Sequence, residues 1–361
     1  MKFSKALFLL CAFAPAAHAA EPVQDKARAV MADMQRVVTP RGVQENYTVE
    51  IGGIPQWVYV RGQDRENPIL LFVHGGPAAP IQPTAWQFQR PLAEYFTVVN
   101  WDQRGAGRTY LASKPEDVAP TLVVERYVED IIELAEHLRT RYHKRKVILV
   151  AHSWGTIIGL KAAAKRPDLF HAYVGAGQVI DGHANEAISF DYGMKRAQAE
   201  NNFAAIKEME TIAPYPGNQP ITRDRVIVAR KWPQHYGGLT AYRSDSNFYY
   251  RGGQLSPEYT QADVAAVDKG SVLTVDRVMD AVLNANLQTV REMKLPVVMF
   301  YGRHDYTTPT APVAKWMAKL QAPLKREVWF EHSAHMMFWE EPGKLLLSLV
   351  EHVLPLADEQ P

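Results

Sequence analysis

A serine stands at position 153 in the segment Ala-His-Ser-Trp-Gly, residues 151–155, between an apolar run and a stretch with helical spacing. The segment is one residue away from G-x-S-x-G, the sharp strand-to-helix turn that exposes a nucleophilic serine. Such a turn needs small residues on both sides, and Ala151 and Gly155 meet that need. A serine there also lies at a helix N-terminus, where backbone N–H groups stabilise a developing negative charge. A plain helix cap is the simpler interpretation of Ser153, but the surrounding motifs favour a nucleophile.

An acid and a base that could activate this serine follow later in the chain. Asp305 comes just after an apolar run at residues 296–301, and His335 comes after a second run at residues 327–330. A serine hydroxyl is a weak nucleophile until a base takes its proton, and a carboxylate can hold that base in the right tautomer. The chain order Ser153, Asp305, His335 is the order known for such a triad on a mostly parallel sheet.

Other titratable residues compete for these roles. Asp181, just past another apolar run, is the alternative acid. Asp102 is a weaker one, because we interpret residues 102–108 as a structural loop whose charges pair with each other. The weaker candidates for the base, each next to a better-placed residue, are His152, His304 and His332. We expect the His152 side chain to point away from the site, since it adjoins Ser153 on the turn.

A glycine-rich segment, His-Gly-Gly-Pro at residues 74–77, follows the apolar run at residues 69–73. We call it the glycine loop. Glycine permits close backbone approach and unusual dihedral angles, so this loop could present a backbone N–H to an oxyanion. Alone it could be an ordinary tight turn, but its place upstream of the serine favours the oxyanion role.

These candidates lie at the ends of short apolar runs that are separated by helical stretches. The runs are residues 69–73, 96–99, 147–150, 172–174, 296–301 and 327–330, and the clearest helices are 123–142 and 156–165. Strands that alternate with helices predict an α/β fold with a mostly parallel sheet and helices on both faces. Ligands bind outside the carboxyl ends of the strands in such sheets, which is where the candidates lie.

Three other segments complete the predicted organisation. Residues 23–38 have apolar side chains at helical spacing and predict a helix docked on the core. Residues 47–60 are typical of a β-hairpin with a Gly-Gly turn. After residue 181 the strand pattern stops, and prolines divide the chain into helical pieces. We therefore predict a core of residues 20–180 and 292–361 with an inserted helical cap of residues 181–291.

Composition and the first residues limit the possible classes of partner. The chain has 361 residues with Lys+Arg 40 against Asp+Glu 39, and this balance argues against nucleic-acid binding. Residues 1–19 combine Lys2, Lys5, a short apolar stretch and an A-x-A site, which predicts a signal peptide cleaved after Ala19 and a periplasmic or secreted protein. The apolar stretch is about a dozen residues, where a membrane span needs about 20, so we expect no stable membrane insertion after cleavage.

The motifs together resemble the proline iminopeptidase-like (prolyl aminopeptidase) family of α/β hydrolases. That family carries a His-Gly-Gly-Pro-Gly loop, a Trp-Asp-Gln-Arg-Gly segment and a Gly-Gly-Ser-Trp-Gly turn, which correspond to residues 74–78, 101–105 and 151–155. The resemblance covers roughly residues 45–180 and 292–355. The departures, where the family usually has glycine, are Ala78, Ala151 and His152. They lie beside the candidate nucleophile and bear on the substrate more than on the type of reaction.

The resemblance implies a role for each matching residue. Ser153 would be the nucleophile, Asp305 the acid and His335 the base. The backbone N–H groups of Gly76 and Trp154 would form the oxyanion hole. The reaction requires no metal and no organic cofactor, and the sequence has no His/Cys/Asp cluster with metal-ligand spacing.

We therefore expect an exported serine hydrolase that forms an acyl-enzyme on a small-molecule or short-peptide substrate. It would be an aminopeptidase that releases an N-terminal residue such as proline, or else a carboxylesterase or amidase. A catalytically silent binding protein is the remaining alternative, which the complete triad disfavours. An aminopeptidase needs a carboxylate to pair with the substrate's ammonium. Candidates in the cap are Glu186, Glu200, Glu208 and Glu210, and Trp232 could line the pocket.

Overall fold

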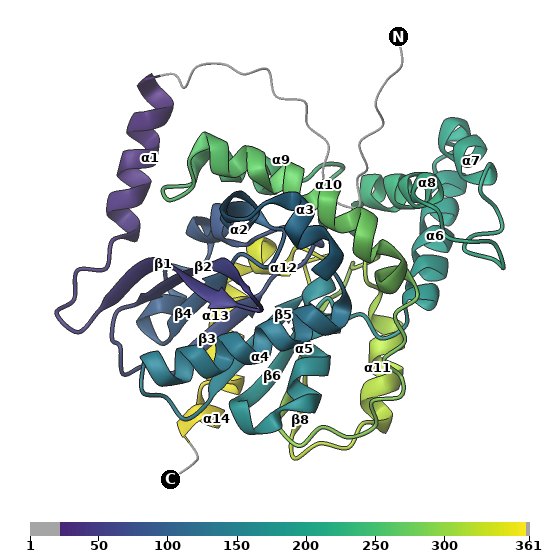
Figure 1. The fold of residues 1–361 in the computed structure, drawn as a ribbon. Coiled ribbons are helices and arrows are strands. Elements are labelled where there is room, and N and C mark those ends of the chain that lie inside the picture. The colour runs from purple at the N-terminus through teal and green to yellow at the C-terminus, as the bar shows by residue number, and fades with distance from the viewer. Residues whose placement is uncertain (1–21, 359–361) are drawn as a thin grey trace.

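The protein, described here by a computed structural model of residues 22–358, is built around one eight-stranded sheet (Figure 1). The strands are β1 (Val43–Ile51), β2 (Ile54–Gly62), β3 (Ile69–Val73), β4 (Thr97–Trp101), β5 (Val147–His152), β6 (Phe170–Ala176), β7 (Val297–Gly302) and β8 (Lys325–Phe330). They lie in the order β1-β2-β4-β3-β5-β6-β7-β8. The pairs β1–β2 and β2–β4 are antiparallel. Every later pair in this order, from β4–β3 to β7–β8, is parallel. The predicted hairpin, strands and mostly parallel sheet are confirmed.

Helices surround this sheet. They are α1 (Pro22–Gln35), α2 (Gly107–Ala112), α3 (Pro115–Val118), α4 (Val124–Arg141), α5 (Trp154–Lys165), α6 (Gly182–Ala199), α7 (Phe203–Glu210), α8 (Arg223–Pro233), α9 (Asn247–Tyr250), α10 (Gln261–Leu283), α11 (Thr310–Lys319), α12 (Met337–Glu340), α13 (Pro342–His352) and α14 (Pro355–Asp358). Within residues 22–358, no helix has the length and apolar character that crossing a membrane requires. The predicted signal peptide, residues 1–19, lies outside the described residues.

Both faces of the sheet are buried under helices. Leu71 of β3 packs in one apolar cluster with side chains of α4, α5 and α11. Its neighbour Phe72 packs in a second cluster with side chains of α12 and α13. Successive residues of a strand point to opposite faces, so a strand covered on both sides must be apolar throughout. This is why the central strands are continuous apolar runs in the sequence.

Helices α6 to α10 separate β6 from β7 in the chain. In Figure 1, α6, α7 and α8 stand together on the side of the molecule opposite the β1–β2 hairpin, and α10 packs against α2. Residues 182–283 form helices and no strand, which agrees with the predicted helical pieces. Their division into a cap of residues 181–291 and a separate core stays a prediction.

The helix predicted from the apolar spacing is confirmed as α1, but the prediction that this helix docks on the core is wrong. Val30 is 61% exposed and Met34 is 69% exposed, and α1 stands at the edge of the molecule (Figure 1). Polar contacts hold it instead: Arg28 donates to the carbonyl oxygen of Tyr259, and Gln35 Nε2 donates to that of Trp86 at 3.2 Å. Helical spacing fixes where an apolar face lies, but it does not determine what covers that face.

The loop that follows β4, residues 102–108, is anchored by a buried ion pair. Arg104 donates from Nε to Asp130 Oδ2 at 2.8 Å and from Nη2 to Asp130 Oδ1 at 3.0 Å, and neither side chain has exposed area. Arg108 pairs with Asp263 of α10, with 2.8 Å between Nη2 and Oδ2. The loop is structural, as expected, and the Arg108 backbone nitrogen donates to Asp102 Oδ2 at 2.8 Å. The expectation that its charged side chains pair with each other is wrong. Both of its arginines reach carboxylates on other elements, which ties the loop to α4 and α10.

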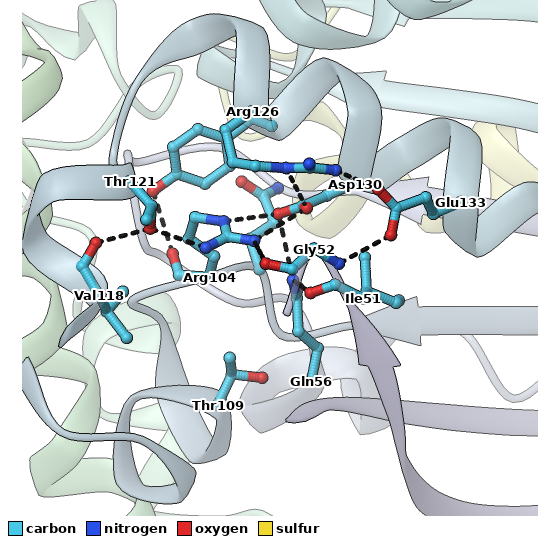
Figure 2. Close-up of polar contacts among 12 residues, drawn as sticks. Ile51, Gly52, Gln56, Arg104, Thr109, Val118, Thr121, Arg126, Asp130 and Glu133 are labelled. Atoms are coloured by element: carbon cyan, nitrogen blue, oxygen red, sulfur yellow. Dashed lines mark hydrogen bonds and ion pairs between the residues drawn. The ribbon is translucent and has the colours of Figure 1, made fainter. Parts of the chain in front are cut away.

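Asp130 collects further donors in the same buried network (Figure 2). Arg126 Nε donates to its Oδ1 at 2.9 Å, and Gln56 Nε2 donates to its Oδ2 at 3.1 Å. Arg104 also donates to the carbonyl oxygen of Gly52 in the hairpin turn at 3.2 Å and to Thr121 Oγ1 at 2.7 Å. A buried charge is tolerated only when it is paired and hydrogen-bonded, and here both partners meet that condition.

We predict that Asp130→Asn lowers the free energy of unfolding by about 3–5 kcal/mol, because it leaves the Arg104 guanidinium buried without a counter-charge. Chemical denaturation followed by circular dichroism measures this change. Glu129→Gln on the same helix is the control. It removes a pair with Lys165 whose side chains are 38% and 55% exposed, so we expect a loss of at most about 1 kcal/mol. Equal losses in the two variants would contradict the anchoring role of Asp130.

Candidate active site

Ser153 forms the turn between β5 and α5 in a conformation that non-glycine residues rarely adopt. Its backbone has φ 57° and ψ −125°, and its side chain makes no capping hydrogen bond to α5. Backbone strain of this kind costs about 1–3 kcal/mol and concentrates at functional sites. The interpretation of Ser153 as a plain helix cap is therefore wrong. The residue is 6% exposed, and it borders two cavities.

The turn is possible because the backbones around it are in close contact. A Cβ atom on Gly155 would lie 2.3 Å from the carbonyl oxygen of Val73, and one on Gly75 would lie 2.7 Å from the Cβ of Ser153. On the next turn of α5, a Cβ on Gly159 would lie 2.9 Å from the Cβ of Ala151. Distances below 3.0 Å are not tolerated between such atoms, so only glycine fits at these positions. This close packing explains why the residues beside Ser153 are small, as the sequence predicts.

The glycine loop lies directly beside the serine turn. Gly76 has φ +111°, and a Cβ on it would lie 2.6 Å from the backbone nitrogen of Ala79. Gly76 lines both of the cavities that Ser153 borders, and Trp154 lines one of them. The structure thus brings the two residues expected to form the oxyanion hole to the same place as Ser153.

Gln103, which the sequence analysis did not single out, connects these two segments. Its Nε2 donates to the carbonyl oxygen of His74 at 2.9 Å, and its Oε1 accepts from the indole Nε1 of Trp154 at 3.2 Å. Its backbone nitrogen donates to His74 Nε2 at 3.2 Å. Burial lowers the pKa of His74 to about 4, so its ring is neutral and can accept this bond. The Trp-Asp-Gln-Arg-Gly segment was the available signal for Gln103.

His335 and Asp305 form a buried pair at the carboxyl ends of β7 and β8. His335 Nδ1 lies 2.9 Å from Asp305 Oδ2, and neither side chain has exposed area. Asp305 Oδ1 accepts from the backbone nitrogens of Thr307 at 2.9 Å and Thr308 at 2.7 Å. Thr308 Oγ1 also donates to Asp305 Oδ2 at 2.9 Å. These bonds fix the orientation of the Asp305 carboxylate toward the imidazole.

The other ring nitrogen of His335 is available for chemistry. His335 Nε2 is buried and has no hydrogen-bond partner among the described residues. His335 and Ser153 line the same cavity. Gly177, just past the end of β6, supports the ring, since a Cβ on it would lie 2.8 Å from His335 Cε1. Gly177 and Thr308 were both missed from the sequence, because their roles arise only where strands far apart in the chain meet.

The alternative acids have other partners. Asp181 caps α6 by accepting from the backbone nitrogen of Ala184 at 2.9 Å, and it accepts from Gln288 Nε2 at 2.7 Å. Asp102 Oδ2 accepts from the Tyr59 hydroxyl at 3.0 Å and also from the Tyr259 hydroxyl. Burial raises the pKa of Asp102 to about 7. Neither carboxylate is paired with His335.

Two of the alternative histidines lie at the surface, whereas the third is part of the site. His304 contacts the Tyr242 hydroxyl at an exposed position, and His332 is exposed. The expectation that His152 points away is wrong. Its ring centroid lies 4.7 Å from that of His335, and its Nε2 lies 2.9 Å from the His335 carbonyl oxygen. Burial and the nearby His335 lower the pKa of His152 to about 3, so this ring is neutral.

One of the four candidate glutamates borders the serine. Glu186 lines the cavity that contains Ser153, Gly76 and Trp154, which we call the cap-side cavity. Its carboxylate is buried and accepts from the guanidinium of Arg230 and from the Tyr215 hydroxyl. The carboxylate therefore lines the same cavity as Ser153, but it already has a cationic partner.

The remaining candidates in the cap do not line this cavity. Glu208 pairs with Lys231 and accepts from Trp232 Nε1 at 2.9 Å. The Trp232 ring packs against His235, with 5.5 Å between the centroids. Glu200 pairs with Arg196 at an exposed position. The glutamate contacts are those of a helix surface, whereas the Trp232 ring packs against two small apolar clusters with side chains of α6 and α7. Among the described residues, no group of three or more His, Cys, Asp or Glu side chains could hold a metal ion.

The fold and the arrangement around Ser153 define the class of protein. The model of the alpha/beta hydrolase family matches residues 70–348, so the chain belongs to that family. YbaC, a probable aminopeptidase of Bacillus subtilis (strain 168), is 30% identical over 307 residues, which cover 84% of this chain and 94% of that protein. Proline iminopeptidase of Neisseria gonorrhoeae is 23% identical over 321 residues, covering 85% of this chain and 95% of that protein.

A solved structure shows the same fold. The crystal structure of proline iminopeptidase from Mycobacterium smegmatis matches with a TM-score of 0.61 at 17% identity, covering 87% of this chain and 99% of that chain. Together with the relatives named above, this match confirms the resemblance to the proline iminopeptidase-like family. The chain is thus an α/β hydrolase with aminopeptidase-type relatives.

We predict that Gly155→Ala lowers the free energy of unfolding by about 1–3 kcal/mol, because the new methyl group would press against the backbone of β3. Thermal and chemical denaturation measure the change. Gly343→Ala in α13 is the matched control, since a Cβ there meets no atom within 4 Å. Alanine favours helices, so we expect this variant to be as stable as the wild type or more so by up to about 1 kcal/mol. A Gly155→Ala protein with unchanged stability would show that the turn can relax.

Proposed function

We propose that the protein is a serine hydrolase in which Ser153 is the nucleophile, His335 the general base and Asp305 the residue that orients it. The observation that carries this proposal is the buried His335–Asp305 pair, whose free Nε2 belongs to the same cavity as Ser153. The strained backbone of Ser153 supports it, because such strain persists only where the surrounding structure enforces it.

The reaction would proceed through an acyl-enzyme. His335 Nε2 takes the proton of the Ser153 hydroxyl as its oxygen attacks the substrate carbonyl. The backbone N–H groups of Gly76 and Trp154 would bind the oxyanion, and each donor of this kind typically stabilises the transition state by about 3 kcal/mol. His335 then gives the proton to the leaving group, and a water molecule that it activates in turn releases the acyl product from Ser153.

The substrate we propose is a short peptide from which an N-terminal residue such as proline is released. The aminopeptidase-type relatives support this. Glu186 and Asn185 also support it, because both line the cap-side cavity. Asn185 Oδ1 is buried without a hydrogen-bond partner among the described residues. A substrate ammonium could therefore donate to oxygen atoms there.

One observation favours a second candidate, a carboxylesterase or amidase for small acyl substrates. The Glu186 carboxylate is neutralised by Arg230, which lines the same cavity. A site whose carboxylate is already paired has less attraction for an ammonium group. Export as a periplasmic or secreted enzyme also stays our proposal, based on the predicted signal peptide at residues 1–19.

We predict that Ser153→Ala abolishes hydrolysis and labelling by a fluorophosphonate probe, because the nucleophilic oxygen is removed. The thermal unfolding midpoint should not fall, since the hydroxyl makes no bond that caps α5. Gel fluorescence of the labelled protein and differential scanning calorimetry measure the two effects. Labelling that persists in this variant would place the nucleophile elsewhere.

We predict that aminoacyl amides with a free amine are hydrolysed at least a hundredfold faster than their N-acetylated counterparts. Acetylation removes the charge that oxygen atoms of the cap-side cavity would bind. The measurement is kcat/KM on matched pairs of proline and alanine derivatives, with p-nitrophenyl acetate as a reference ester. Equal rates on free and acetylated substrates would refute the aminopeptidase proposal and support the esterase or amidase alternative.

A further inference from the structure

Two cavities of different chemistry meet at Ser153 and Gly76. The cap-side cavity contains the charged pair of Glu186 and Arg230. The second, which we call the His335-side cavity, contains His335 and lies between the glycine loop and helices α9 and α12. A carbonyl carbon bound at Ser153 has two substituents besides its oxygen. The acyl part and the leaving group must therefore extend in different directions.

The position of His335 determines which direction belongs to the leaving group. In the proposed reaction, the C–N bond breaks as His335 Nε2 transfers its proton to the departing nitrogen, while the acyl carbon stays bonded to Ser153 Oγ. The departing nitrogen must then lie within hydrogen-bond reach of His335 Nε2. His335 lines the second cavity and does not line the first. The leaving group accordingly belongs in the His335-side cavity.

The walls of the His335-side cavity are apolar and aromatic. Its large side chains are Ile81, Tyr249, Met336 and Trp339. The rings of Tyr249 and Trp339 meet edge to face, with 5.0 Å between their centroids. Among the described residues that line it, none is Asp, Glu, Lys or Arg, and its second imidazole, that of His152, is neutral. A charged group that entered this space would be desolvated without a counter-charge.

One polar atom at this cavity lacks a partner. The indole N–H of Trp339 is buried and makes no hydrogen bond with any described residue, although the side chain lines the cavity. An unpaired buried donor is unfavourable until an acceptor reaches it. A leaving group that carries a carbonyl next to an apolar side chain, as the second residue of a peptide does, would suit such a surface.

We propose that the His335-side cavity, whose free volume is about 10 Å³ in this structure, is the inner end of a leaving-group subsite. The subsite widens when the half-buried Tyr249 ring moves, and it then takes an apolar or aromatic side chain on the residue that follows the scissile bond. This inference rests on the proposed serine hydrolase function and extends it. The subsite selects the residue after the scissile bond, and this selection does not depend on the Glu186–Arg230 pair in the cap-side cavity. Substrates with Phe or Leu after the scissile bond are then preferred over those with Gly, and those with Asp are disfavoured.

The test is kcat/KM on three dipeptide amides with one common N-terminal residue and Phe, Gly or Asp in second position. We expect Phe to exceed Gly at least tenfold and Asp to fall below Gly. Tyr249→Ala should lower kcat/KM on the Phe substrate more than on the Gly substrate, and so reduce the Phe-over-Gly ratio by about tenfold. Tyr249→Phe keeps the ring and should keep the ratio. Equal rates for Phe and Asp in the wild type, or an equal loss on all substrates in Tyr249→Ala, would overturn the proposal.

A second set of substrates separates this proposal from the choice of reaction. Benzyl and ethyl esters of one acyl group have alcohols of similar leaving ability and differ mainly in the ring. If peptides are not cleaved but benzyl esters exceed ethyl esters and Tyr249→Ala removes the difference, the aminopeptidase function fails and the subsite stands. Protection of Ser153 from fluorophosphonate by phenylalaninamide, compared with glycinamide, tests the subsite without turnover; it is measured at about pH 9, where both amines are largely neutral. Equal protection by the two amides would overturn it.

Discussion

The close contact between β3, β5 and α5 at Ser153 is the constraint on which the rest of the site depends. Three backbone segments approach so closely that Gly75, Gly155 and Gly159 have no room for a side chain. This contact forces the serine into a positive φ and leaves its side chain free of the helix that follows. Strain is tolerated there because the buried sheet and helices around the turn enforce it, and Ser153 lies where the two cavities meet.

A second set of contacts fixes the position of the glycine loop relative to the serine turn. Gln103 bonds both His74 and the Trp154 indole, so the glycine loop and the start of α5 share one support. The support is rigid because the next residue, Arg104, is fixed to Asp130 of α4. Preorganised donors contribute most to catalysis when they need not move during the reaction. The buried polar side chains of this region therefore serve to fix neighbouring elements relative to one another.

Much of the fold and part of the candidate site could be predicted from sequence because they depend on local patterns. Apolar runs ended by glycine, serine or aspartate give the strands and the residues at their carboxyl ends. What could not be predicted depends on residues that meet only in three dimensions. His152 was expected to point outward since sequence adjacency says nothing of the space between β5 and the His335 loop. Likewise, the partner of Arg104 lies 26 residues away on α4, and α1 is exposed although its spacing is helical.

The carboxylate of Asp130 has a further consequence for how the molecule opens. It joins the hairpin side chain Gln56, the loop after β4 and the helix α4 in one shared set of bonds. Segments linked through a single buried charge cannot detach one at a time, since each departure would leave that charge less compensated. Fluctuations of the antiparallel strands β1 and β2 are thereby coupled to those of the parallel part of the sheet. The β1–β2 turn, the loop after β4 and the start of α4 are then expected to open together as one cooperative unit.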